Sequence, residues 1–168
     1  MRPNRGAAEL IERLYASIGD ADALRHSVAS VGDLLRAEAG GVHEYDFGLK
    51  KGRGMLKLSD AFLRRYAEHY SSLNVWMIQG RDKVAPGRIL LSHATFPEER
   101  LEDTEWYSDF LRPENLFHST GVVLGMDAGV STTATFLRPK GAGRFGSADV
   151  AALRRLAPHL RRVFALHR

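Results

Sequence analysis

The chain of 168 residues is long enough for one domain with a substantial core, and its 44% apolar and 26% charged residues are ordinary for a globular protein. It has no apolar run near the roughly 18 residues of a membrane span, and its start, MRPNRGAAELIERL, is too charged for a signal peptide. The absence of cysteine excludes disulfides and thiolate metal sites and leads us to expect a cytoplasmic protein, and the net charge of +4 is modest.

The N-terminal part of the chain predicts two helices. Apolar residues recur at helical spacing from Ala8 to Ile18, and Gly19 is placed to end that helix. Asp20 is a suitable cap for a second helix. The apolar face of this second helix consists of Leu24, Val28, Val31 and Leu35.

A hairpin is predicted next, because the apolar period changes to two. In Val42–Leu49, the side chains of Tyr45 and Phe47 fall on one face of a strand. Lys50–Gly54 is the expected turn, and Met55–Leu58 the return strand.

The middle of the chain predicts a third helix, a short strand and a short aromatic helix. Ser59 is placed to cap a helix that runs through about Leu73, after which Asn74–Met77 leaves the helix. Arg88–Leu91 is a short strand. Asp103 or Thr104 then precedes a helix with two aromatic ridges, formed by Trp106, Tyr107, Phe110 and Leu111.

Two strands and a long helix complete the chain. Leu116–Met126 and Ser131–Leu137 flank a hairpin turn at Asp127–Gly129. The last helix starts at Ser147, and Pro158 inside it should bend it or break its hydrogen bonds locally. We expect one face of this helix to pack on the sheet domain. We expect the rest of its apolar stripe to meet a second copy of the chain, through Leu160, Val163, Phe164 and His167.

The order of elements predicts an α+β fold, because strands and helices do not alternate as parallel βαβ units would. About five strands form a mostly antiparallel sheet with flanking helices. A GAF- or PAS-like arrangement fits, with the helices of both termini on one face and the connecting segments enclosing a cavity on the other. We expect one sensory domain over 1–168, with a C-terminal connector helix from about 147.

Motifs for catalysis are weak in this chain. Gly141, Gly143 and Gly146 spell G-x-G-x-x-G, but the helix cap lies after the third glycine and no second strand follows, so a dinucleotide site is not expected. Strand alternation separates His43 from the carboxylates of Glu44 and its neighbours, and no two histidines stand four apart on a helix. No residue set argues for an enzyme, a metal or a cofactor.

Aromatic side chains are the remaining candidates for a site. Residues that join an apolar body to a polar group suit a small-molecule cavity, although a core rich in aromatics explains most of them equally well. The candidate ligand contacts are Tyr45, Tyr66, Tyr70, Trp76, Trp106, Phe110, Phe117 and His118.

Several segments resemble one family. Glu105–Pro113, Leu116–Ser119 and Gly121–Leu124, followed by Phe136–Pro139 and Leu153–Arg162, are similar to the N-terminal sensory domains of LuxR-family helix-turn-helix transcriptional regulators. The resemblance implies a dimeric GAF/PAS-like sensor that binds a small effector and signals through its last helix. It also implies that the DNA-binding domain is absent from this chain.

One motif of the family differs here. Its acyl-homoserine-lactone receptors carry an Asp-Pro pair after an aromatic helix, where the nearest match in this chain is Asn74-Val75. The aspartate that would accept the ligand's amide N–H is therefore replaced.

Three other functions stay open. A protein-interaction or dimerisation module would have a filled core and no ligand. A small enzyme would need Glu44, Asp46 or His118 inside the cavity as an acid or base. Direct DNA binding has the least support, because the basic residues of the last helix are explained by a solvated face.

Overall fold

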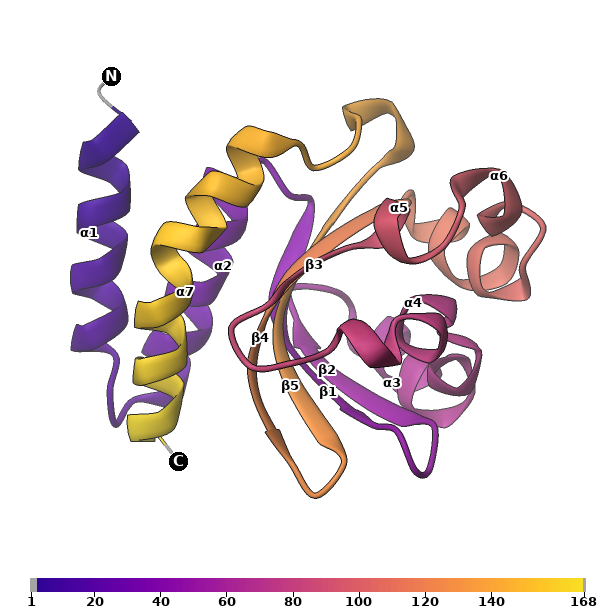
Figure 1. Ribbon diagram of the computed structural model, residues 1–168, viewed down its shortest axis with the longest axis horizontal. Helices are drawn as coiled ribbons and strands as arrows, with labels where there is room; N and C mark the ends of the chain where they lie inside the picture. The colour runs from indigo at the N-terminus through magenta and orange to yellow at the C-terminus, as the bar shows by residue number, and fades with distance from the viewer. Residues whose placement is uncertain (1–2, 168) are drawn as a thin grey trace.

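A single antiparallel sheet forms the centre of the molecule (Figure 1). The computed structural model describes residues 3–167, apart from the side chains of residues 3, 4, 55 and 56. Its five strands lie in the order β2-β1-β5-β4-β3, and every neighbouring pair is antiparallel. The strands are β1 (Ala39–Asp46), β2 (Lys51–Leu56), β3 (Ile89–Leu91), β4 (His118–Asp127) and β5 (Val130–Arg138). The predicted α+β class with about five strands is confirmed.

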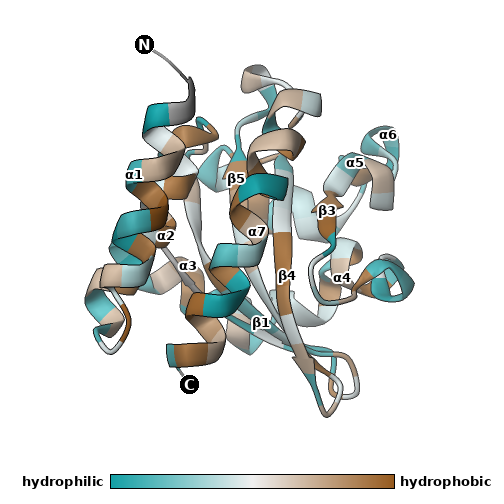
Figure 2. Ribbon diagram, turned by 60° about the vertical axis from the view of Figure 1, so that its left-hand side comes forward, coloured by the Kyte–Doolittle hydropathy of each residue, from teal (hydrophilic) through white to brown (hydrophobic). Residues whose placement is uncertain are grey.

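Helices from the two ends of the chain cover one face of this sheet (Figures 1 and 2). They are α1 (Pro3–Ala16), α2 (Ala21–Leu34) and α7 (Ser147–His167). Figure 2 shows hydrophobic residues in the middle of β4, beside α7. None of the helices between residues 3 and 167 has both the length and the apolar character needed to cross a membrane.

The connecting segments cover the other face (Figure 1). They form a series of short helices, separated by β3 and loops, whose aromatic side chains make a second apolar cluster. The segments are α3 (Asp60–Glu68), η1 (Tyr70–Leu73), α4 (Val75–Gln79), η2 (Arg81–Lys83), α5 (Ser92–Thr95), α6 (Glu98–Leu101), η3 (Trp106–Leu111) and η4 (Arg112–Glu114), and η5 (Lys140–Ala142) follows the sheet.

Alternation along β5 divides the side chains between the two faces. Ala134 and Phe136 belong to the core beneath the terminal helices, whereas Thr133, Thr135 and Leu137 lie on the side of the connecting segments. The helix-side core is fully buried at Leu14, Val28, Val31, Val122, Phe136, Leu153, Leu156, Leu160 and Val163.

Several local predictions are confirmed. Asp20 caps α2, and its carboxylate accepts from the backbone N–H of Asp22 and Ala23. The β4–β5 hairpin turns at Ala128 and Gly129, which both have positive φ (48° and 81°), as a tight two-residue turn requires.

Three local predictions are wrong. The first hairpin turns before Lys51, because the Asp46 carboxylate accepts from the backbone N–H of Gly48 (2.8 Å) and Leu49 (3.0 Å) and so stabilises an earlier turn. The predicted helix from Ser59 ends at Glu68. Asn74 lies outside a helix as expected, but it accepts from the Met77 N–H and caps α4, so that residues 75–77, also expected outside a helix, are helical.

The last helix is continuous through Pro158. Leu160 and Val163, expected at a dimer contact, are completely buried against the sheet, because a stripe that suits self-pairing suits a sheet equally well. This expectation is therefore corrected for both residues. Phe164 is half-buried at the edge of the same core, and His167 Nδ1 accepts from the Gly19 N–H at 3.3 Å.

Candidate functional site

A cavity lies between the sheet and the connecting segments. About 80 Å³ of it is open to the centres of water molecules, which is room for several waters at about 10–15 Å³ each. Side chains of β1, β3, β4 and β5 meet those of α3, α4, α5 and η3 around it. The residues that carry the argument below are His43, Tyr66, Asn74, Trp76, Trp106, Thr133 and Thr135.

Small side chains of the sheet leave room for the cavity. Thr133 and Thr135 of β5 and Gly121 of β4 contribute to its lining, whereas Phe136 and Val122, which follow Thr135 and Gly121, belong to the core on the opposite face. Gly121 is paired with Thr135, and a Cβ at Gly121 would lie 2.6 Å from the carbonyl oxygen of Ala134. Strands β4 and β5 can therefore lie this close together only with glycine at position 121.

Large aromatic side chains of the connecting segments cover the cavity. The Trp76 and Trp106 rings meet edge to face with centroids 5.6 Å apart, and Tyr66 meets Trp106 in the same way at 5.9 Å. Trp106 is 4% exposed and Tyr66 5%. Phe110 packs behind Trp106, with ring centroids 5.0 Å apart. We call the connecting segments from α3 to η4 the lid. Its aromatic side chains are closely packed, and the free space lies between them and the sheet.

A buried chain of hydrogen bonds connects three lining residues. His43 Nε2 lies 2.6 Å from the Tyr66 hydroxyl, and Asn74 Nδ2 donates to the same hydroxyl at 3.0 Å. Burial lowers the pKa of His43 to about 4 and raises the pKa of Tyr66. His43 is therefore neutral at pH 7, and the Tyr66 hydroxyl, which accepts from Asn74, donates to His43. These groups satisfy one another.

Three other polar groups of the lining have no partner. Trp76 Nε1, Trp106 Nε1 and Thr133 Oγ1 are buried without a hydrogen bond to any part of the chain that the structure describes. A buried donor without a partner costs free energy, and most such groups in folded proteins are satisfied by protein or water. Three of the six such atoms found among the described residues belong to the lining of this one cavity.

The lining carries no ionic charge at neutral pH. Among the described residues that form it, there is no Asp, Glu, Lys or Arg, and His43 is neutral. Nor do three His, Asp or Glu side chains of residues 3–167 come together as a metal site would require. The cavity therefore suits a neutral, mainly apolar molecule.

The predicted ligand contacts fall into two groups. Tyr66, Trp76 and Trp106 line the cavity together. The other five lie outside its lining. Tyr45 is buried next to Phe47, Tyr70 stacks on Phe110, Phe117 meets Tyr107, and His118 contacts Glu98.

Sequence reasoning missed most of the lining, including the polar residues His43, Asn74, Thr133 and Thr135. The place of His43, Thr133 and Thr135 on the inner face follows from strand alternation, but alternation does not show which segments cover that face. For Asn74 a signal existed, because it stands at the position nearest to the family's ligand-binding aspartate.

The residues considered for catalysis lie outside the lining. Glu44 pairs with Arg53 at 2.5 Å, and the Asp46 carboxylate is used in the hairpin turn. Gly141, Gly143 and Gly146 lie in an exposed loop before α7.

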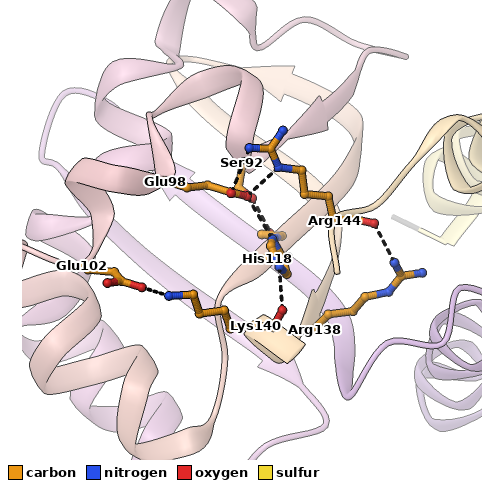
Figure 3. A network of polar contacts seen from close by, with 8 residues as sticks. Ser92, Glu98, Glu102, His118, Arg138, Lys140 and Arg144 are labelled. Atoms are coloured by element: carbon orange, nitrogen blue, oxygen red, sulfur yellow. Dashed lines mark hydrogen bonds and ion pairs between the residues drawn. The ribbon is translucent and has the colours of Figure 1, made fainter. Parts of the chain in front are cut away.

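His118 belongs to a separate polar network at the start of β4 (Figure 3). Its Nδ1 lies 3.2 Å from Glu98 Oε1 and its Nε2 lies 3.3 Å from the Lys140 carbonyl oxygen. Arg144 binds Glu98 through two contacts of 3.1 and 3.0 Å. Burial would raise the pKa of Glu98, but the bonds and charge of Arg144, with His118 nearby, lower it overall. This network ties the lid to the loop before α7.

Comparison with solved structures identifies the fold. The ligand-binding domain of VqsR from Pseudomonas aeruginosa matches with a TM-score of 0.71 at 13% identity, over 98% of this chain and 94% of that one. CepR2 of Burkholderia cenocepacia, an N-acylhomoserine-lactone-dependent LuxR-family transcription factor, matches with a TM-score of 0.65 at 14% identity, over 98% and 95%.

A GAF domain is similar as well. That of a phosphoenolpyruvate-protein phosphotransferase from Coxiella burnetii matches with a TM-score of 0.59 at 13% identity, over 95% of this chain and 93% of that one. No protein-family model and no curated protein sequence matches the chain. The predicted resemblance is thus confirmed at the level of the fold: over nearly its whole length, the chain folds as the ligand-binding domains of LuxR-family regulators and as GAF domains do.

Proposed function

We propose that this chain is the small-molecule-sensing domain of a LuxR-type transcription regulator. One observation supports it above the others: a partly open, uncharged cavity whose lining residues include unpaired hydrogen-bond donors, on the sheet face away from the terminal helices. CepR2, which shares the fold, depends on an N-acylhomoserine lactone. The cavity is where such a fold would hold its own effector.

The alternative was an interaction module with a filled core. Such a module has no reason to leave space beneath its lid, or to keep two indole N–H groups buried without partners, because each costs stability. The cavity and the unpaired Trp76 and Trp106 nitrogens therefore favour sensing.

The route of signalling that we propose runs from the sheet to α7. Leu137 lines the cavity, and the next residue, Arg138, is 3% exposed. Its guanidinium donates to the carbonyl oxygens of Leu35 (3.2 Å) and Arg144 (3.1 Å), and to Asp149 Oδ1 (3.0 Å) in the first turn of α7. A shift of β5 or the lid would therefore reach the start of α7 directly.

A ligand changes the position of α7 only if it binds two arrangements of the domain with different affinity. The second contact along this route is the pairing of lid residue Glu98 with Arg144 (Figure 3). An effector that closes the lid would favour the arrangement in which this pair is made. Attached DNA-binding domains would then be repositioned through α7.

Filling the cavity tests the proposal. Thr135→Phe should occupy the free space, whereas Thr135→Val keeps the volume and serves as the matched control. Neutral compounds of six to nine carbons, such as alcohols, ketones and esters, are titrated while thermal unfolding is followed. A compound at 100 times its Kd should stabilise the wild type by about 2.7 kcal/mol, a shift of about 5–10 °C.

We expect the Thr135→Val variant to respond like the wild type and the Thr135→Phe variant to lose the response. If no compound of the panel shifts the wild type, or if the filled variant responds equally, the cavity is not the sensor site.

A further inference from the structure

The exposed face of α7 differs in charge from the exposed faces of the other terminal helices. From residue 150 to residue 167 the sequence of α7 has four arginines and no aspartate or glutamate. The one acidic residue of the helix, Asp149, pairs with the buried Arg138 at 3.0 Å. The four arginines are all exposed, and they are Arg154, Arg155, Arg161 and Arg162.

The period of the helix brings these arginines to one side, and Figure 2 shows hydrophilic positions on the side of α7 that faces away from β4. Arg154 and Arg161 form one row, and Arg155 and Arg162 form a second row about 100° around the helix. Within each row the two residues are about 10.5 Å apart along the axis. Small exposed residues lie between the rows, namely Ala151, Pro158 and Ala165. An extended partner can therefore reach both rows.

A solvated helix face usually mixes charges of opposite sign, as the exposed faces of α1 and α2 do. In α1, Arg5, Glu9 and Arg13 follow one another at a spacing of four residues. In α2, Asp22 pairs with Arg25. None of the positions three or four residues from the arginines of α7 holds a carboxylate. Solvation alone therefore explains this face less well than it explains the other two.

The positive charge of the face is not neutralised from elsewhere in the fold. The side chains of Arg154 and Arg162 make no hydrogen bond or ion pair with any residue in the described part of the chain. Arg161 Nε donates to the carbonyl oxygen of Leu124 at 3.4 Å, a contact that orients the side chain and leaves its charge in place. Like charges held this close together repel one another, and an anionic partner relieves that repulsion.

A polyanion fits this face better than a second copy of the chain does. A symmetric pairing of two α7 faces would place arginines opposite arginines. The acidic stretch 98–105 offers no simple match, because Glu98 pairs with Arg144 and Glu102 with Lys140. Duplex DNA carries one negative charge per about 1.7 Å of its axis, so that 10.5 Å along α7 corresponds to about three base-pair steps.

We propose that the arginine face of α7 binds the phosphate backbone of duplex DNA without reading its sequence. Phosphate contacts of this kind add affinity and fix orientation, but they carry no sequence information. The inference goes beyond the proposed sensing function and rests on it only in the choice of DNA as the polyanion. The cavity takes no part in it.

Fluorescence anisotropy with a labelled duplex of arbitrary sequence, about 24 base pairs long, tests the proposal on the whole chain. Four phosphate contacts predict that the logarithm of the binding constant falls with the logarithm of the salt concentration with a slope of about −3.6. Replacing Arg155 and Arg162 together by glutamine should reduce the slope to about −1.8. The matched control removes the same charge from the lid, by glutamine at the exposed Arg64 and Arg112, and should leave the slope unchanged.

No binding at about 20 mM salt would overturn the inference, as would an equal loss of slope in the α7 and lid variants. Poly-L-glutamate should bind more weakly than the duplex at equal charge, because its charges lie about 3.4 Å apart when it is extended. Tighter binding of poly-L-glutamate would instead assign the face to an acidic protein. Self-association that is lost with Arg155 and Arg162 would assign it to a second copy.

The cavity variant separates this inference from the proposed function. Thr135→Phe should bind the duplex as tightly as the wild type does. A protein that responds to cavity ligands but does not bind the duplex would contradict the DNA contact alone. A protein that binds the duplex but responds to no cavity ligand would contradict the sensing function alone.

Discussion

The two faces of the sheet are built from the same strands but differ in how they are filled. Beneath α1, α2 and α7, large apolar side chains such as Phe136 and Leu156 are completely buried in a packed core. Beneath the connecting segments, Thr133 and Thr135 leave space under an aromatic lid. Adjacent residues of β5 thus have different roles, since Phe136 fills the core and Thr135 lines the cavity.

The difference shows how one sheet combines stability with binding. The helix face supplies close packing and fixes the terminal helices, whereas the cavity face keeps polar groups unsatisfied at a cost in stability. Binding sites often carry such a cost, which a ligand removes. Substitutions on the two faces should therefore change different properties.

Neighbouring residues of β5 provide the largest contrast. Phe136→Ala should lower the free energy of unfolding by about 3–5 kcal/mol, because it removes a ring that is completely buried on the helix face. Thr135→Val, one residue away on the cavity face, should cost less than about 1 kcal/mol. Urea unfolding measures both. Equal losses at the two positions would contradict the division of the sheet into a packed and an open face.

The buried guanidinium of Arg138 gives the next largest effect. Arg138→Met should cost about 3 kcal/mol, because it leaves Asp149 and the Leu35 carbonyl oxygen without their cation. Arg144→Met is the control, because its side chain is 55% exposed and its pair with Glu98 should contribute at most about 1 kcal/mol. A loss at Arg138 no larger than that at Arg144 would remove the proposed link between β5 and α7.

Acid should destabilise the cavity face through His43. Its pKa is about 4 in the folded protein and 6.5 when unfolded, so the unfolded chain binds more protons between these values. Stability from this residue is complete above pH 6.5 and is lost as the pH falls towards 4, by up to about 3 kcal/mol.

His43→Gln tests this dependence, since the glutamine keeps an acceptor for the Tyr66 hydroxyl and does not titrate. The unfolding free energy of this variant should vary less between pH 6.5 and 4 than that of the wild type. If the unfolding free energies of the variant and the wild type change with pH in parallel, His43 is not buried in its neutral form.

The smallest effect on stability concerns the outer end of α7, where we propose that a second copy binds. Leu166 is 57% exposed beside the half-buried Phe164 and His167. Leu166→Asp should change stability by less than about 0.5 kcal/mol but weaken a dimer. Leu49→Asp, at a 73% exposed position of the first hairpin, is the matched control. A dimer that survives the Leu166 change in sedimentation experiments would rule out this contact.

Much of the fold could be predicted because its signals are local. Apolar periods located the strands and helices, and Asp20 and Gly129 carry the chemistry of their cap and turn. The covering of the cavity could not be predicted in the same way. Whether His43 or Tyr45 faces free space depends on which distant segment lies above each, and this is a tertiary property.

The last helix shows a second limit of sequence patterns. Its heptad stripe predicts an apolar face but not the partner of that face. Leu160 and Val163 satisfy the stripe by packing on the sheet of their own chain. The same residues could equally have met a second copy, and only the position of the sheet decides between the two.

The central claim is that one face of the sheet is closed and the other holds a ligand cavity. The most direct test is the electron density of crystals of the protein exposed to xenon, which binds in apolar cavities that are large enough. We expect xenon between Trp106 and Thr135, and none among Leu153, Leu156 and Phe136 beneath the terminal helices. Density beneath the helices, or none beneath the aromatic lid, would contradict the account.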